Sequence, residues 1–164
     1  MTKLRPSDGL VLGTFTVGSG ANGVAFDGKN IWVANYNSNS VTKLQPSNGA
    51  VLGTFTVGRG PVGLAFDGAN IWVTNQNSNN VTKLQASTGR VLGTFTTGNR
   101  PYDVAFDGAN IWVANFNGNN VAKLRASDGA VIGTFATGTS PQGVAFDGAN
   151  IWVVNAGSNT VSKM

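Results

Sequence analysis

The chain has 164 residues, of which 11% are charged, and a formal net charge of +4. It contains no histidine, cysteine or glutamate, which excludes disulfides, thiolate metal sites and every catalytic arrangement that needs an imidazole or a thiol. Its few basic residues are spread thinly, and no apolar run is long enough to cross a bilayer. We therefore expect a soluble chain with no nucleic-acid or membrane partner and, because the opening residues lack an apolar stretch, no signal peptide.

One unit of 40 residues recurs four times without insertion or deletion. Such a fixed period is the signature of a repeat architecture. We divide the single domain, residues 1–164, into repeats of about 1–40, 41–80, 81–120 and 121–160. The motif Asn-Ile-Trp-Val marks each repeat and carries Trp32, Trp72, Trp112 and Trp152.

Each repeat contains four short segments rich in β-branched and aromatic residues, separated by turn residues. In chain order, the first complete set predicts strands near 22–27, 30–35, 40–45 and 50–57, which we call A, B, C and D. Asp-Gly between A and B is a strong hairpin signal, and clusters of Asn, Ser and Gly follow B and C. No segment has the apolar period of an amphipathic helix, so the sequence predicts an all-β fold.

The consecutive apolar residues Ile71, Trp72 and Val73 give both faces of strand B apolar side chains. Both faces of a sheet are covered when sheets stack as the blades of a β-propeller. A four-stranded unit of about 40 residues also fits one blade, with the recurring tryptophan packed between blades. A β-solenoid is the alternative architecture.

The pattern P-x-G-V-A-F-D-G-A-N-I-W-V-A-N-x-x-S-N-N-V-T-K-L resembles the YVTN/NHL-type propeller repeats, including those of virginiamycin B lyase-like proteins. Val73-Thr74-Asn75 gives the nearest match to the family motif, and the resemblance covers essentially the whole chain. It implies a β-propeller. The lyase-like enzymes use histidine and glutamate at a metal-assisted site, and since this chain has neither residue type, the resemblance does not carry that site over.

The repeats are offset from the expected blades. The chain begins in strand C at 2–4, continues through strand D at 11–17, and ends with strands A to C at 144–164, so the last blade lacks strand D. Two open arcs sharing one ring satisfy both ends, and we expect a homodimer that forms an eight-bladed propeller. A closed four-bladed monomer of the hemopexin type is the alternative. The offset and the regular repeats also suggest an engineered or excised fragment.

Sequence variation among the four copies gathers in the D–A and B–C connections, which lie at the same end of an up-and-down ring. Loops on a rigid scaffold commonly carry binding residues, and aromatic and arginine side chains suit a contact face. We expect this face to recognise a protein, a peptide or a glycan, although drift in unconstrained loops would give the same variation. The candidate residues are Asn22, Tyr36, Arg59, Val62, Gln76, Asn99, Arg100, Tyr102, Asp103, Phe116 and Gln142.

The remaining polar repeats favour structural roles. We expect the recurrent aspartates of the Asp-Gly turns to bond their own turns rather than a metal, and the recurrent strand-C lysines to be solvated charges that protect a sheet edge. Asp103 is an isolated carboxylate, which does not make a paired acid and base. The sequence thus predicts a binding scaffold with no catalytic, metal or cofactor site, or alternatively a purely structural array that assembles without a ligand; a metal-dependent lyase is less favoured.

Overall fold

The computed structural model describes all residues 1–164 and contains 17 β-strands and no helix, which confirms the all-β prediction. Consequently no helix is present that has the length and apolarity needed to cross a membrane. The strands form five antiparallel sheets. Three of these sheets have four strands each, and the two at the ends of the chain are incomplete.

The four-stranded sheets, blades 1 to 3, follow the expected A-to-D order. Blade 1 contains β3 (Ala21–Phe26), β4 (Ile31–Asn35), β5 (Ser40–Leu44) and β6 (Val51–Thr56). Blade 2 contains β7 (Pro61–Phe66), β8 (Asn70–Asn75), β9 (Asn80–Gln85) and β10 (Val91–Thr96). Blade 3 contains β11 (Pro101–Phe106), β12 (Asn110–Asn115), β13 (Asn120–Arg125) and β14 (Val131–Ala136).

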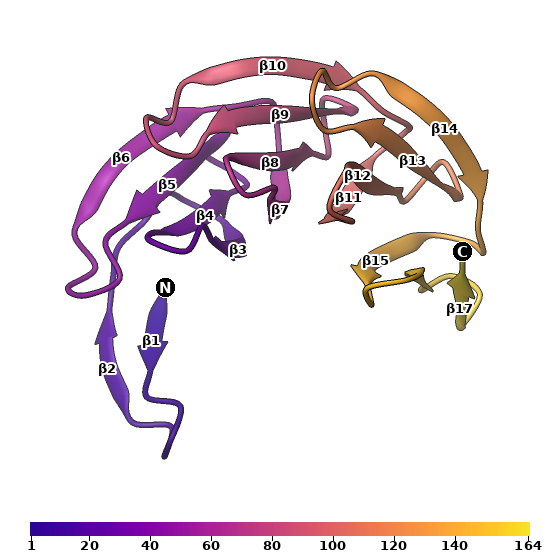
Figure 1. The fold of residues 1–164 in the computed structure, drawn as a ribbon. Helices are drawn as coiled ribbons and strands as arrows, with labels where there is room; N and C mark the ends of the chain where they lie inside the picture. The colour runs from indigo at the N-terminus through magenta and orange to yellow at the C-terminus, as the bar shows by residue number, and fades with distance from the viewer.

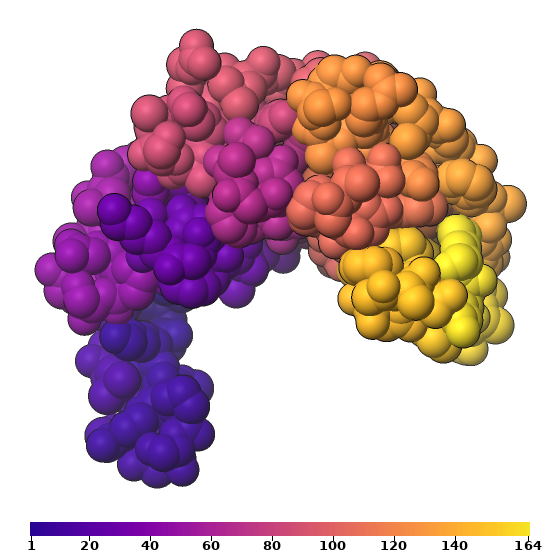
Figure 2. Space-filling view, viewed as in Figure 1, coloured from indigo at the N-terminus to yellow at the C-terminus, as the bar shows by residue number.

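The two incomplete sheets stand at opposite ends of an open arc (Figure 1). The N-terminal hairpin is β1 (Thr2–Leu4) paired with β2 (Val11–Thr14), and the C-terminal sheet is β15 (Pro141–Phe146), β16 (Ile151–Asn155) and β17 (Thr160–Lys163). Because β2 pairs with β1 and not with β17, the chain does not close on itself as a four-bladed ring. Figure 2 shows the wide opening between the two ends.

The blades stack face to face, with β3, β7, β11 and β15 side by side along the inner edge of the arc. The apolar core consequently lies between blades. Trp32 of blade 1 packs with Ile71 and Leu84 of blade 2, and Trp72 of blade 2 packs in the same way with Ile111 of blade 3. Full burial of such a tryptophan removes roughly 150–250 Å² from water. The expectation that both faces of a blade are apolar because both are covered is confirmed.

A hydrogen-bond network ties each core tryptophan to the turn that precedes it. The indole Nε1 of Trp72 donates to Asp67 Oδ2 at 2.8 Å, while Asp67 Oδ1 accepts from the backbone N–H of Ala69 at 2.9 Å and of Asn70 at 2.7 Å. The same arrangement recurs in every repeat. The expected turn role of these aspartates is confirmed, and the indole contact makes each turn part of the core as well.

We expect Asp67→Ala to lower the free energy of unfolding by about 1–3 kcal/mol, because it leaves the buried indole N–H without an acceptor. Partial burial opposes ionisation of Asp67, but the hydrogen bonds from Trp72, Ala69 and Asn70 outweigh it and hold the carboxyl pKa below its ordinary value of 3.8. Because the pKa is lower in the folded state, ionised Asp67 stabilises the fold, and this stabilisation is fully present above pH 3.8. The stabilisation is lost as the pH falls through the folded-state pKa. Urea titrations of both proteins should therefore show their difference shrinking below pH 3.8. A difference that grows on acidification would contradict the assignment.

Candidate functional site

The D–A and B–C connections meet on one face of the arc, as predicted, and we call this surface the loop face. In each repeat, backbone hydrogen bonds clip the two connections together. The N–H of Phe116 in the B–C turn donates to the carbonyl of Arg100 in the D–A loop at 2.9 Å, and the N–H of Gln76 donates to Gly60 in the same way. The loops of the loop face are therefore fixed to one another by backbone hydrogen bonds.

Three of the candidate residues come together on blade 3, and we call Arg100, Tyr102 and Phe116 the loop cluster. The guanidinium carbon of Arg100 lies 5.2 Å from the centre of the Phe116 ring, and the Tyr102 and Phe116 rings have centroids 6.1 Å apart. Arg100 is exposed, and both rings are half-buried. A cation over an aromatic face with a second ring beside it can receive an anionic or flat polar group.

The backbone fixes Arg100 in this position. Its φ of 59° lies in the left-handed region, where the counterparts Gly20 and Gly60 also lie. The N–H of Arg100 donates to Asn79 Oδ1 of the neighbouring B–C turn at 2.8 Å, which holds the loop in this conformation. Ser140, the counterpart in repeat 4, has the same left-handed backbone with φ of 53°, so this conformation belongs to the D–A loop of every repeat.

The other candidates divide by exposure. Asn22, Arg59 and Asn99 are exposed, and Gln142 is half-buried on β15. Val62 and Gln76 are buried, with 4% and 5% of their surfaces exposed, so their assignment to the contact surface was wrong. Gln76 also joins two blades, because its Oε1 accepts a hydrogen bond from the Tyr36 hydroxyl at 3.1 Å.

Tyr36 and Asp103 connect neighbouring blades rather than facing outward alone. The Tyr36 hydroxyl reaches Gln76 and also accepts from Asn77 Nδ2 at 3.1 Å, which joins blades 1 and 2. Asp103 lies on the inner strand β11, and its Oδ2 accepts from the N–H of Val144 on β15 at 3.0 Å. Burial raises the pKa of the Asp103 carboxyl, against the hydrogen bonds that favour its ionised form.

The recurrent lysines were wrongly interpreted as solvated charges. Lys43 and Lys83 are only 7% exposed. Lys83 Nζ lies 5.1 Å from the centre of the Trp72 ring and donates to the carbonyls of Ala126 at 2.6 Å and Ser127 at 3.2 Å, in the C–D turn of the next blade. Strand pairing places each lysine beside its tryptophan, as in Trp72↔Lys83. Lys43 and Lys83 thus each join one blade to the next. Lys3 does the same from the N-terminal hairpin, donating to the carbonyl of Pro46 at 2.8 Å.

We expect Lys83→Met to lower the free energy of unfolding by about 1.5–3 kcal/mol, because it removes the charged hydrogen bonds that a buried lysine donates. Lys29→Ala is the matched control, since Lys29 is exposed and its counterparts Ala69 and Ala109 are alanines. The control should change stability by less than about 0.5 kcal/mol. Equal unfolding midpoints for both variants in urea would show that the lysine adds nothing between blades.

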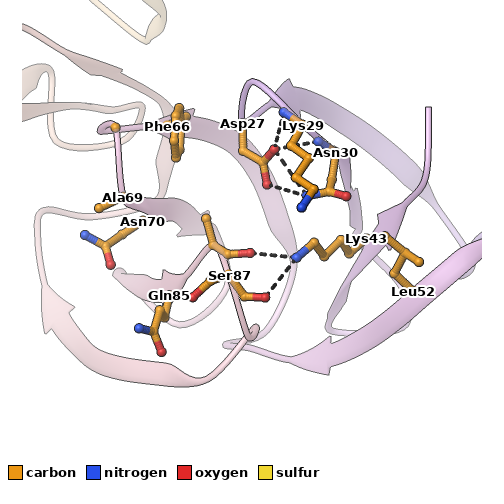
Figure 3. A pocket seen from close by; sticks show the side chains of 12 residues that line it. Asp27, Lys29, Asn30, Lys43, Leu52, Phe66, Ala69, Asn70, Gln85 and Ser87 are labelled. Carbon is orange, nitrogen blue, oxygen red and sulfur yellow. Dashed lines mark hydrogen bonds between the residues drawn. The ribbon is translucent and has the colours of Figure 1, made fainter. Parts of the chain in front are cut away.

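The largest cavity lies on the face of the arc opposite the loop face. It has a volume of about 590 Å³ and opens between the A–B and C–D turns of blades 1 and 2. Figure 3 shows Lys43 reaching across it to the carbonyls of the facing turn, with Lys29 and Asp27 above Lys43 in the view. None of the candidate residues lines this cavity or either of the other two, so the loop face is a surface rather than a pocket. No group of three or more acidic, histidine or cysteine side chains converges to form a metal cage.

Comparisons with known proteins establish the fold class. No family model and no curated protein matches the chain. Among solved structures, Kuenenia stuttgartiensis hydrazine synthase is similar at a TM-score of 0.81 and 21% identity over 95% of this chain. A protein of Bacteroides uniformis assigned as a 6-phosphogluconolactonase is similar at 0.77 and 17% identity over 99% of this chain, and the computationally designed Ika4 protein at 0.79 and 11% identity over 93%.

The extent of these matches differs. This chain spans 49% of the hydrazine synthase chain and 59% of the Bacteroides chain, but 98% of Ika4. At these identities the likeness shows a shared propeller-type fold of repeated antiparallel sheets. The prediction that this chain is not an enzyme is contradicted, because two of the similar structures bear the names of enzymes. The fold class therefore gives no ground for excluding catalysis.

Proposed function

We propose that this chain is a propeller scaffold whose loop face recognises a protein, a peptide or a glycan. The loop face would bind an acidic group of that ligand. The observation that carries this proposal is the loop cluster, in which Arg100 lies over Phe116 with Tyr102 beside it. Arginine and tyrosine are among the residue types that most often dominate binding energy. A net charge of +4 adds a general attraction for an acidic ligand.

The chain itself offers variants that should keep the fold. At the position of Arg100, repeats 1 and 2 have glycine with the same left-handed backbone, and at the position of Phe116, repeat 4 has Ala156. Arg100→Gly with Phe116→Ala therefore uses residues that other blades already accommodate. Arg90→Ala is the control. Arg90 is exposed in a C–D turn on the face opposite the loop face, and its counterparts Ala50 and Ala130 are alanines.

The test is a screen of the native chain against arrays of acidic peptides and of carboxylated or sulfated glycans, followed by titration of the best probe. We expect the double variant to bind that probe at least about tenfold more weakly, which corresponds to the ~1.4 kcal/mol expected from one partly desolvated cation and an aromatic contact. The control should bind as the native chain does. Unchanged affinity in the double variant, or no probe bound by the native chain, would contradict the proposal.

We propose as a second function that the chain assembles with itself into a larger ring, as a homodimer with eight blades. The observation that favours it is the exposure of apolar core positions at the two ends of the arc. Trp152 is 40% exposed on the C-terminal sheet, whereas Trp32 and Trp72 are 0% exposed. At the other end, Val24 and Phe26 of blade 1 are exposed. Two arcs joined head to tail would cover both ends of each chain.

Kinship with the YVTN/NHL-type repeat family is also our proposal. It is supported by the repeated Asp-Gly-x-Asn-Ile-Trp-Val segment, in which the aspartate accepts from the tryptophan indole in every blade.

A further inference from the structure

The two ends of the arc carry opposite halves of the contacts that join neighbouring blades. Between blades 1 and 2, Trp32 packs against Ile71, Leu84 and Ala86, with Phe55 and Leu64 alongside. At the N-terminal end, a cavity of about 300 Å³ is lined by the residues one repeat earlier, namely Phe15, Val24, Ile31, Leu44 and Pro46. The wall that surrounds a core tryptophan is therefore present there without the tryptophan.

A second vacant contact lies in the C–D turns. Phe55 packs on Gly89, Phe95 packs on Gly129, and Phe15 packs on Gly49, each at a glycine with positive φ. Gly9 has the same backbone, with φ of 75°, but no atom lies within 4 Å of the position its Cβ would occupy. The phenylalanine left over is Phe135 of blade 3, which is 43% exposed.

The lysines show the same complementarity. Lys83 donates to the carbonyls of Ala126 and Ser127, whereas Lys123 lies 4.9 Å from the centre of the Trp112 ring and has no carbonyl acceptor. The residues that correspond to its missing acceptors are Pro6 and Ser7, which stand in the N-terminal turn at the other end of the arc.

We propose that a second copy of this chain supplies these contacts, so that Trp152 fills the cavity beside Phe15 and Phe135 packs on Gly9 of the partner subunit. This inference rests on the proposed self-assembly and names the residues that form it. Each end of the chain meets the opposite end of its partner, so two identical seams form. Each seam completes a blade from β15, β16 and β17 of one copy and β2 of the other.

The exchange requires β17 of one copy to take the place of β1 beside β2 of the other. Both strands carry the strand-C pattern, but β17 fits the blade better. Asn155, which is 1% exposed, donates from Nδ2 to Thr160 Oγ1 at 3.2 Å and to Ser162 Oγ at 2.9 Å. β17 also pairs with β16 through four residues, whereas β1 pairs with β2 through only three. We therefore expect β17 to remain in the blade and β1 to be displaced.

The register of the exchanged pair follows from blade 1, where Thr42 faces Thr54 across β5 and β6. One repeat away, this places Ser162 of one copy opposite Thr14 of the other. Directly opposed residues in antiparallel strands have Cα atoms about 4.5–5.5 Å apart, which suits a disulfide. The chain has no native cysteine, so single cysteine variants report on this pair alone.

The experiment mixes two single variants, Ser162→Cys and Thr14→Cys, and oxidises them under native conditions. A bond between the two cysteines can only join different molecules. The control mixture replaces Thr14→Cys by Thr54→Cys, because Thr54 is equally exposed but already pairs with Thr42 in its own blade. We expect a covalent species of twice the chain mass of 16.9 kDa in the first mixture only.

Adding Trp152→Ala to the Ser162→Cys chain should abolish most of that covalent species, because the tryptophan no longer fills the cavity. Absence of the species in the first mixture, equal amounts in both mixtures, or no effect of Trp152→Ala would overturn the inference. If ring assembly occurs through other contacts, the native chain would still be dimeric while the first mixture stays uncrosslinked, which separates the two failures. No ligand is involved, so recognition on the loop face is tested separately.

Discussion

Trp72→Ala should lower the free energy of unfolding by about 3–5 kcal/mol, which is the range for removing a fully buried large aromatic side chain. Trp72 is 0% exposed and packs with Val104, Ile111 and Leu124 of the next blade. It also donates to Asp67 and lies beside Lys83, so its removal takes one hydrogen bond from the carboxylate and the aromatic face from the ammonium. The loss should therefore fall in the upper part of the range.

Urea denaturation followed by circular dichroism at one fixed protein concentration measures this loss. The concentration is fixed because self-association would itself stabilise the folded chain. Leu92→Ala is the control, since Leu92 lies on the outer strand β10 and is 41% exposed. It should cost less than about 1 kcal/mol. If the two variants lose equal stability, the core does not lie between the blades.

Gly89→Ala should lower the free energy of unfolding by about 2–5 kcal/mol. The backbone at Gly89 has φ of 79°, which costs about 1–3 kcal/mol for a residue with a Cβ. An added Cβ would also overlap the ring of Phe55 from the preceding blade, and overpacking adds about 1–3 kcal/mol. The expected loss combines both effects.

Gly68→Ala separates the two causes. Gly68 has φ of 96°, but no atom lies within 4 Å of the position of its Cβ, so only the backbone strain applies. We expect Gly89→Ala to be more destabilising than Gly68→Ala by about 1–3 kcal/mol in the same urea titration. Equal losses would mean that Phe55 moves aside freely and does not pack on the glycine.

Much of the fold follows from the sequence because the repeat makes each inference four times over. The period of 40 residues, the Asp-Gly hairpin and the doubly apolar strand around Trp72 predict four-stranded blades, and the structure confirms them. The turn role of Asp67 was predictable from Asp-Gly alone. Its bond to the Trp72 indole was not, because the strand register decides whether the two side chains meet.

Contacts between blades were the main source of error. Lysine is usually a surface residue, and only the stacking of blades brings the Lys83 ammonium to the carbonyls of Ala126 and Ser127. Val62 and Gln76 vary between repeats as surface residues do, yet both are buried. The sequence did contain one signal of this role. The lysine recurs in every repeat, as the tryptophan does, whereas a freely solvated charge would be expected to vary.

The loop cluster was identified only as separate residues. Arg100, Tyr102 and Phe116 were each singled out because they differ from their counterparts in other repeats. Their association depends on the hydrogen bond from the Phe116 N–H to the carbonyl of Arg100. This bond joins two loops that strands β11 and β12 separate in the sequence. Sequence variation therefore located the surface, and the backbone clips determine which of its residues act together.

We expect a second copy of the chain to complete the two open ends of the arc. The most direct test is the mass of the native chain in solution, measured by light scattering after size exclusion over a range of concentrations. We predict a species of twice 16.9 kDa that persists on dilution. A species that stays at 16.9 kDa throughout that range would contradict the claim and leave the arc as a single open chain.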